Sequence, residues 1–93
     1  MSNAIILDAT DNVATAIVDI AQGETVQAQG RSVTTTEVIP FGHKVALCPL
    51  ADGAVILKYG ESIGLALGAI AEGACVHVHN VDSQRGRGDR GDK

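Results

Sequence analysis

The heptapeptide IPFGHKV, residues 39–45, contains the pattern that decides the fold. The same I-x-x-G-x-x-V spacing occurs in IAQGETV at 20–26 and in IAEGACV at 70–76, and LADGAVI at 50–56 is a looser copy. In each copy an apolar residue begins the segment, a glycine permits a backbone angle that other residues resist, and Val or Ile enters a strand. The copies start at residues 20, 39, 50 and 70, which is not the fixed period of a solenoid. The pattern predicts one compact domain that reuses a turn-to-strand device.

The composition favours a small, turn-rich β domain. The chain has 93 residues and 11 glycines, and its only aromatic residues are Phe41 and Tyr59. The core must therefore be built from Val, Ile, Leu and Ala, and β-branched residues in short apolar runs are typical of strands. We predict a mainly β fold with short helical turns, in a single domain over residues 1–82.

Charge and hydropathy exclude several classes of partner. The net charge of −4 gives no general support for binding nucleic acid. The sequence has no apolar run of about eighteen residues, so we expect no transmembrane helix and no membrane partner. It lacks the basic and apolar segments of a secretory signal, and we expect a cytoplasmic protein. Cys48 and Cys75 form no C-x-x-C pair, and in that compartment we expect both thiols to be reduced.

Alternation and turn residues divide the chain into strands. The expected strands cover residues 4–9, 12–20, 44–50, 54–60 and 75–81, with a strand, a turn at Gly30 and a second strand over 25–39. The alanines of 12–20 leave a short helix open, and 61–70 suits either a helical turn or a bulged strand. Residues 83–93 are charged, Gly-rich and without apolar residues, so we expect a flexible solvated tail or a segment that orders against a partner.

The stretch VHVHN, residues 76–80, carries two of the three histidines. On a strand, His77 and His79 would point to one face, because side chains alternate with period two. Two such imidazoles can contact a divalent metal or act as acid and base near neutral pH. They can equally be half-exposed strand residues that bond to their neighbours. Asn80 suits a turn that ends the strand.

Two further segments carry polar groups. In FGHKV, residues 41–45, His43 and Lys44 follow a glycine, and the lysine could bind a carboxylate as a point charge or lie in a plain surface loop. In KYGES, residues 58–62, Gly60 predicts a tight turn with Tyr59 at its tip, where a phenol usually packs. The remaining candidates are Lys58 and Glu61.

Together these segments resemble a known family. IPFGHKVAL, ILKYGESIG, IAEGACVHVHNV and RGRGD, in this order, are similar to the amino-terminal domain of the altronate and galactarate dehydratases. The resemblance covers about residues 4–89 and implies an SAF-like domain with a β-clip fold. Some members carry it as a separate small subunit, as in sulfolactate sulfo-lyase. The chain ends just after RGRGD, where the fused enzymes continue, so we expect a free-standing small subunit.

The resemblance implies a hydro-lyase that removes the proton α to a carboxylate and expels the β-substituent. The implied catalytic residues are His77, His79 and His43, and the implied substrate-binding residues are Lys44, Asn80 and Tyr59. His77 and His79 would also contact a divalent metal, with Fe²⁺ as a candidate, shared with or held by a large catalytic subunit. The substrate would be a small polyhydroxy acid such as altronate or galactarate.

Other hypotheses stay open at this stage. SAF-type domains also serve as binding or assembly modules, in which the histidines would be structural. The chain could also be the small subunit of a sulfolactate sulfo-lyase, or a metal-binding protein by itself. Without its partner, a small domain with an apolar edge strand could form a homo-oligomer.

Overall fold

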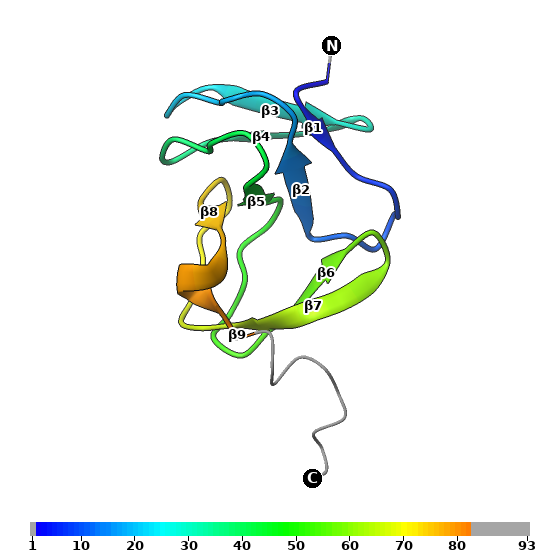
Figure 1. Cartoon of the computed structure of the whole chain (residues 1–93), viewed down its shortest axis with the longest axis vertical. Coiled ribbons are helices and arrows are strands. Elements are labelled where there is room, and N and C mark those ends of the chain that lie inside the picture. Colours follow the sequence, from blue (N-terminus) through cyan, green and yellow to red (C-terminus); the bar gives the residue numbers. More distant parts are fainter. Residues whose placement is uncertain (1, 83–93) are drawn as a thin grey trace, which may run out of the picture.

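The computed structural model describes residues 2–82, which form three antiparallel sheets (Figure 1). The central sheet has four short strands in the order β1-β2-β5-β8, namely Ala4–Ile5, Val13–Ala16, Lys44–Ala46 and Cys75–Val76. A hairpin of β3 (Thr25–Ala28) and β4 (Arg31–Thr34) lies at one end. At the other end lie β6 (Val55–Lys58), β7 (Glu61–Ala66) and β9 (Val81–Asp82). The predicted mainly β class is confirmed.

The four copies of the recurring heptapeptide pair with one another. Ile20 forms an antiparallel bridge with Ile39, and Leu50 forms one with Ile70. Each bridge has two reciprocal backbone hydrogen bonds, with N···O distances of 2.7–2.9 Å, and all four side chains are buried. Each bridge therefore joins two successive copies, the first pair within residues 20–45 and the second within residues 50–76.

The glycine of one copy is required by space as well as by conformation. Gly73 has φ +86°, a left-handed backbone angle that suits glycine. A Cβ atom at this position would lie 2.1 Å from the backbone oxygen of Thr34. The turn before β8 therefore packs directly against the end of β4, and this contact helps to place the strand that carries the histidines.

The core consists of aliphatic side chains, as the composition predicts. Its two clusters contain mainly Val, Ile, Leu and Ala, and Ile20, Ile39, Ile56, Val13, Val26, Val45 and Val76 are among the largest fully buried side chains. Both aromatic residues stay partly outside, with Phe41 66% and Tyr59 38% exposed. Neither thiol is in a disulfide, and Cys75 is buried while Cys48 is partly buried.

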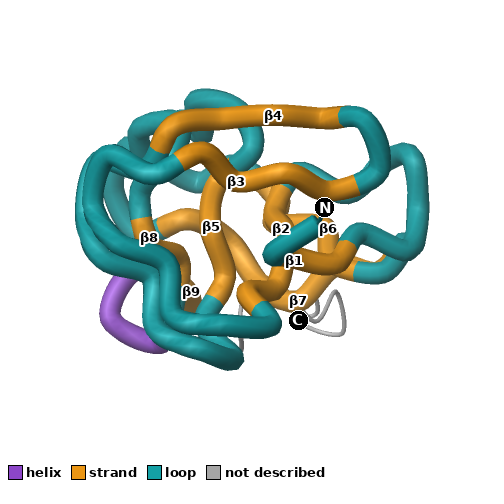
Figure 2. Tube along the Cα trace, turned by 90° about the horizontal axis from the view of Figure 1, so that it is seen from above, coloured by secondary structure: helices purple, strands orange, loops and turns teal. Residues whose placement is uncertain are grey.

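Several expected strands are shorter than predicted, and one prediction is wrong. Residues 12–20 contain a strand and not a helix, 25–39 contain the predicted hairpin, and 61–70 contain the strand β7, opposite a register shift in β6. Residues 75–81 are not one strand, because β8 ends at Val76 and a 3-10 helix follows at Val78–Asn80. Figure 2 shows this turn beside β8 and β9, away from the β3–β4 hairpin.

No helix within residues 2–82 is long and apolar enough to cross a membrane. The tail predicted for residues 83–93 lies outside the described residues.

Candidate functional site

The register between β5 and β8 brings two histidines together. Lys44 is paired with Val76 and Val45 with Cys75, so the next residues outward, His43 and His77, face each other across the strand ends. Their rings stack, with centroids 3.8 Å apart and planes inclined by 10°. The site therefore starts from a contact between two segments that are distant in the sequence.

Asn80 holds the 3-10 turn that follows His77. Its Oδ1 accepts a hydrogen bond from the His77 backbone N–H at 2.9 Å, and its Nδ2 donates to the Cys75 carbonyl oxygen at 2.9 Å. The Asn80 backbone N–H also donates to the His77 carbonyl oxygen at 3.0 Å. Because both ends of its amide are used, Asn80 fixes the backbone that presents the His77 ring.

The His77 ring sits in a setting that disfavours its charged form. Its Nδ1 is buried and has no hydrogen-bond partner within residues 2–82. Partial burial lowers the pKa of His77 below its usual value, and the neighbouring His43, Lys44 and His79 lower it further by charge repulsion. The lowered pKa favours the neutral form of the ring at neutral pH.

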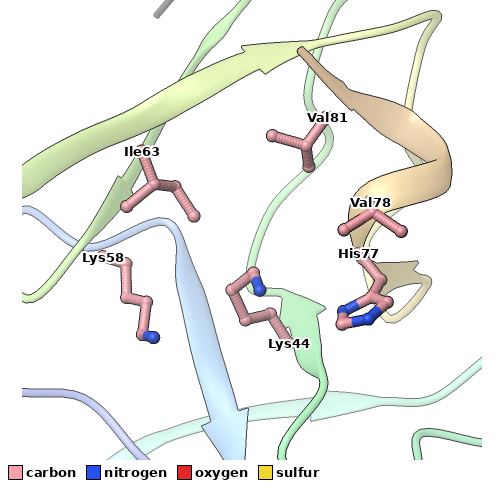
Figure 3. A pocket seen from close by; sticks show the side chains of 6 residues that line it. All are labelled: Lys44, Lys58, Ile63, His77, Val78 and Val81. Carbon is pink, nitrogen blue, oxygen red and sulfur yellow. The ribbon is translucent and has the colours of Figure 1, made fainter. Parts of the chain in front are cut away.

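A cavity of about 470 Å³ lies beside this ring (Figure 3). Its lining combines two lysines, one imidazole and three aliphatic side chains: Lys44, Lys58, His77, Ile63, Val78 and Val81. Figure 3 shows Lys58 and His77 on opposite sides of Lys44, with Ile63 and Val81 above them. The cavity is thus formed by β5, β6, β7, β9 and the turn after β8.

Lys44 is half-buried at the start of β5, where it faces the cavity. Burial lowers the pKa of its ammonium, and repulsion from Lys58 lowers the pKa further, while Cys75 acts in the opposite direction. Two ammonium groups that repel each other across an apolar-walled cavity form a site for an anion. A carboxylate would relieve this repulsion and supply hydrogen-bond acceptors.

Lys58 reaches the cavity from the last position of β6. The tight turn after it has φ +57° at Tyr59 and φ +80° at Gly60, as the KYGES motif predicts. The buried carboxylate of Asp11 secures the turn, since its Oδ1 accepts a hydrogen bond from the Gly60 N–H at 2.7 Å. The Lys58 ammonium lies 4.9 Å from the centroid of the Tyr59 ring, a cation–π contact that helps to orient it.

Asn12 secures the other strand end of the same hairpin. Its Nδ2 donates to the Val55 carbonyl oxygen at 2.9 Å, and its Oδ1 accepts from the Leu57 N–H at 2.8 Å. The side chain thereby acts as an extra pairing partner for β6. Asp11 and Asn12 were not among the residues predicted from sequence, because their role depends on contacts with a distant hairpin.

Comparison with known proteins shows the family of this chain. The family model described as the SAF domain of altronate/galactarate dehydratase matches residues 2–84. The chain belongs to this family. The SAF domain is 46% identical over 75 residues to an altronate dehydratase of Escherichia coli, and 40% identical over 81 residues to one of Bacillus subtilis. These matches cover 81% and 87% of the chain, but only 15% and 16% of the two dehydratases.

A third relative has a length close to that of the SAF domain. The (2R)-sulfolactate sulfo-lyase subunit alpha of Chromohalobacter salexigens is 34% identical over 88 residues. This match covers 87% of the chain and 94% of the relative. The resemblance predicted from the motifs is therefore confirmed, for both the dehydratase domain and the separate alpha subunit.

The structure brings together only some of the predicted site residues. His77 and Lys44 line the cavity, and His43 stacks on His77. The prediction that His77 and His79 share a strand face is wrong, because His77 precedes the 3-10 helix and the exposed His79 lies within it. Neither His79 nor Tyr59 lines the cavity, and the side-chain amide of Asn80 is engaged by backbone.

Lys58 lines the cavity, although the sequence predicts no substrate-binding role for it and marks it only as one of several polar candidates. The available signal was its position directly before the Tyr59–Gly60 turn, because the residue before a tight hairpin turn lies at the end of a strand. Which cavity that strand end faces depends on how β6 packs against β2 and on where the turn after β8 lies.

These residues do not fit a complete metal site. Within residues 2–82, no group of three or more His, Cys, Asp or Glu side chains could hold a metal ion. The stacked rings of His43 and His77 also have nearly parallel planes, so their in-plane nitrogen lone pairs do not converge on one ion. The divalent metal expected from sequence therefore has no ligand set in this part of the chain.

Proposed function

We propose that this SAF domain is the small subunit of a hydro-lyase that dehydrates a sugar acid of the altronate or galactarate type. The family membership carries this proposal, and the cavity with two lysines and a neutral imidazole supports it. The finer elements, namely the substrate, the need for a large catalytic subunit and a cytoplasmic location, are parts of the same proposal.

The proposed reaction begins with loss of the proton on the carbon next to the carboxylate. The electron pair of that C–H bond forms a carbon–carbon double bond, and the β-hydroxyl leaves as water after it gains a proton. The resulting enol then tautomerises to a 2-oxo-3-deoxy acid. Negative charge develops on the carboxylate during the first step, so cations positioned there lower the barrier.

Lys44 is the proposed carboxylate-binding residue in this scheme. His77 is the proposed proton-transfer residue, because it lines the cavity and a neutral imidazole can accept a proton at neutral pH. His43 is a positioning residue that keeps the His77 ring in place by stacking. His79 is assigned no step, and we place the ligands of any divalent cation mainly on the large subunit.

Mixing the SAF domain with a candidate large chain of the same family tests the proposal. Dehydration of altronate and of galactarate would be followed by the absorbance of the semicarbazone of the 2-oxo product. We expect activity only when both chains are present, and a loss of at least about a hundredfold in His77→Gln, as is typical for removal of an acid–base group. His79→Gln is the matched control and should retain most of the activity. Full activity of the large chain alone would refute the proposal.

A second candidate is the small subunit of a sulfolactate sulfo-lyase. The extent of the match to the alpha subunit of Chromohalobacter salexigens favours it. The same assay with (2R)-sulfolactate, read out as released sulfite, separates the two candidates. If His77→Gln and Lys44→Met complexes assemble and remain fully active on every acid, the domain is an assembly module with structural histidines.

A further inference from the structure

We propose that the cavity selects small acids with two negative charges over acids of the same size with one. The proposal rests on the proposed function, since it narrows the substrate class of that site. It concerns the ammonium groups of Lys44 and Lys58, which enter the same cavity from different strands.

The first argument is the charge of the cavity wall. The Lys44 and Lys58 ammonium groups repel each other, and Lys58 has the Tyr59 ring as its polarisable neighbour. The third polar group, His77, is held neutral, so it does not compete with the lysines for an anion. An acid with one carboxylate can neutralise one ammonium closely and leaves the other facing an apolar wall. An acid with two anionic groups can neutralise both.

The second argument is that both lysines are held at their strand ends. Lys44 is paired through its backbone with Thr15 on one side and Val76 on the other. Lys58 is paired with Glu61 across the hairpin, and Asp11 secures the turn that follows. The backbone positions of both lysines are therefore fixed by the sheets, so a ligand has to order only their side chains.

The third argument is the apolar remainder of the lining. Ile63, Val78 and Val81 give one side of the cavity an apolar surface, and charge interactions are stronger beside such a surface than in open water. Val78 is 78% exposed at this edge, so a partner chain that covers it would close the cavity further. Both effects increase the difference in affinity between a ligand that pairs with one lysine and a ligand that pairs with two.

Binding of matched acids to the 93-residue chain tests the proposal. Galactarate has two carboxylates and galactonate has one, and both have six carbons. We would follow the side-chain NMR signals of Lys44, Lys58 and His77 during titration with each acid. We expect galactarate to bind about tenfold more tightly than galactonate or better, with both lysine signals shifting. Equal affinities, or no shift of the Lys58 signal at saturating galactarate, would overturn the proposal.

The variants separate a specific pair of charges from overall charge. Lys58→Gln should remove the preference for galactarate, whereas Lys58→Arg should keep it. Lys93→Gln changes the net charge by the same amount as Lys58→Gln and should leave the preference unchanged. A preference that persists in Lys58→Gln, or that disappears in Lys93→Gln, contradicts the proposed role of the lysine pair. Failure to bind either acid at tens of millimolar also contradicts it.

The outcome is independent of the outcome for the proposed function. If the chain prefers galactarate but forms no active complex, the proposed dianion site is supported and the proposed lyase role is refuted. An active complex whose Lys58→Gln variant discriminates between the two acids as the unmodified chain does would keep the lyase role and refute the dianion site.

Discussion

His43 and His77 stack face to face, with their ring centroids 3.8 Å apart, because the β5–β8 register places them opposite each other. This contact joins the GHK segment to the HVHN segment, which are the two most distinctive motifs of the chain. It also places the His77 ring against the cavity that contains Lys44 and Lys58. The motifs therefore belong to one site although only part of each motif lines it.

The first prediction concerns the pH titration of His77. Its pKa in the folded chain should lie below the usual 6.5, because partial burial and the nearby His43, Lys44 and His79 disfavour the imidazolium. Lys44→Met removes one of these groups and should raise the pKa toward the usual value. Side-chain NMR of the histidines against pH measures both. A His77 pKa at or above 6.5 in the unmodified chain would contradict the structure.

The lowered pKa of His77 also predicts how the stability of the folded chain changes with pH. Below pH 6.5 the unfolded chain binds a proton at His77 more readily than the folded chain does, so His77 makes stability fall as pH falls through that value toward the lower folded pKa. Urea unfolding at several pH values measures this slope. His77→Gln should flatten the slope in that window, and an unchanged slope would show that another group causes it.

The second prediction separates the role of Asn80 at the site from its contribution to stability. Asn80→Ala removes two hydrogen bonds, to the His77 N–H and the Cys75 carbonyl oxygen, and should cost about 1–3 kcal/mol. Asn3→Ala is the matched control, because its amide also makes two bonds, to the Gln27 N–H and the Thr25 carbonyl oxygen. Urea unfolding should give similar losses for the two variants. Only Asn80→Ala should shift the NMR titration of His77.

The third prediction compares two glycines with similar backbone angles. Gly73→Ala should destabilise by about 3 kcal/mol or more, because its Cβ meets the Thr34 oxygen at 2.1 Å. Gly53 has φ +82° but open space around it, so Gly53→Ala should cost only about 1–2 kcal/mol of backbone strain. Thermal and urea unfolding measure the difference. Equal costs would show that the close approach of β4 to this turn does not occur.

The fourth prediction concerns the buried carboxylate of Asp11. Asp11→Asn places an amide among three backbone N–H groups, those of Gly60, Leu7 and Asp8, and should cost about 1–3 kcal/mol. It should also shift the side-chain NMR signals of Lys58, which precedes the Gly60 turn. Asp52→Asn is the control, since the exposed Asp52 accepts one backbone bond, from Gly68, and should cost less than about 1 kcal/mol. If Asp11→Asn leaves both stability and the Lys58 signals unchanged, Asp11 does not secure this turn.

By itself, the sequence determined the mainly β class, the aliphatic core and the turns. These features follow from local rules, because Gly60 and the heptapeptide glycines specify backbone angles and a chain with two aromatic residues must pack Val, Ile and Leu. The motifs also determined the family, which the match over residues 2–84 confirms.

Only the tertiary structure decided the composition of the site. The alternation of side chains along a strand places His77 and His79 on one face. The strand ends at Val76, however, and Asn80 accepts a hydrogen bond from the His77 N–H in the turn that follows, so the alternation does not apply there. The neighbours of His77 are instead His43, through strand register, and the lysine-lined cavity, which the packing of β6 against β2 completes. Register and packing arise from contacts between residues far apart in the chain, which local spacing does not encode.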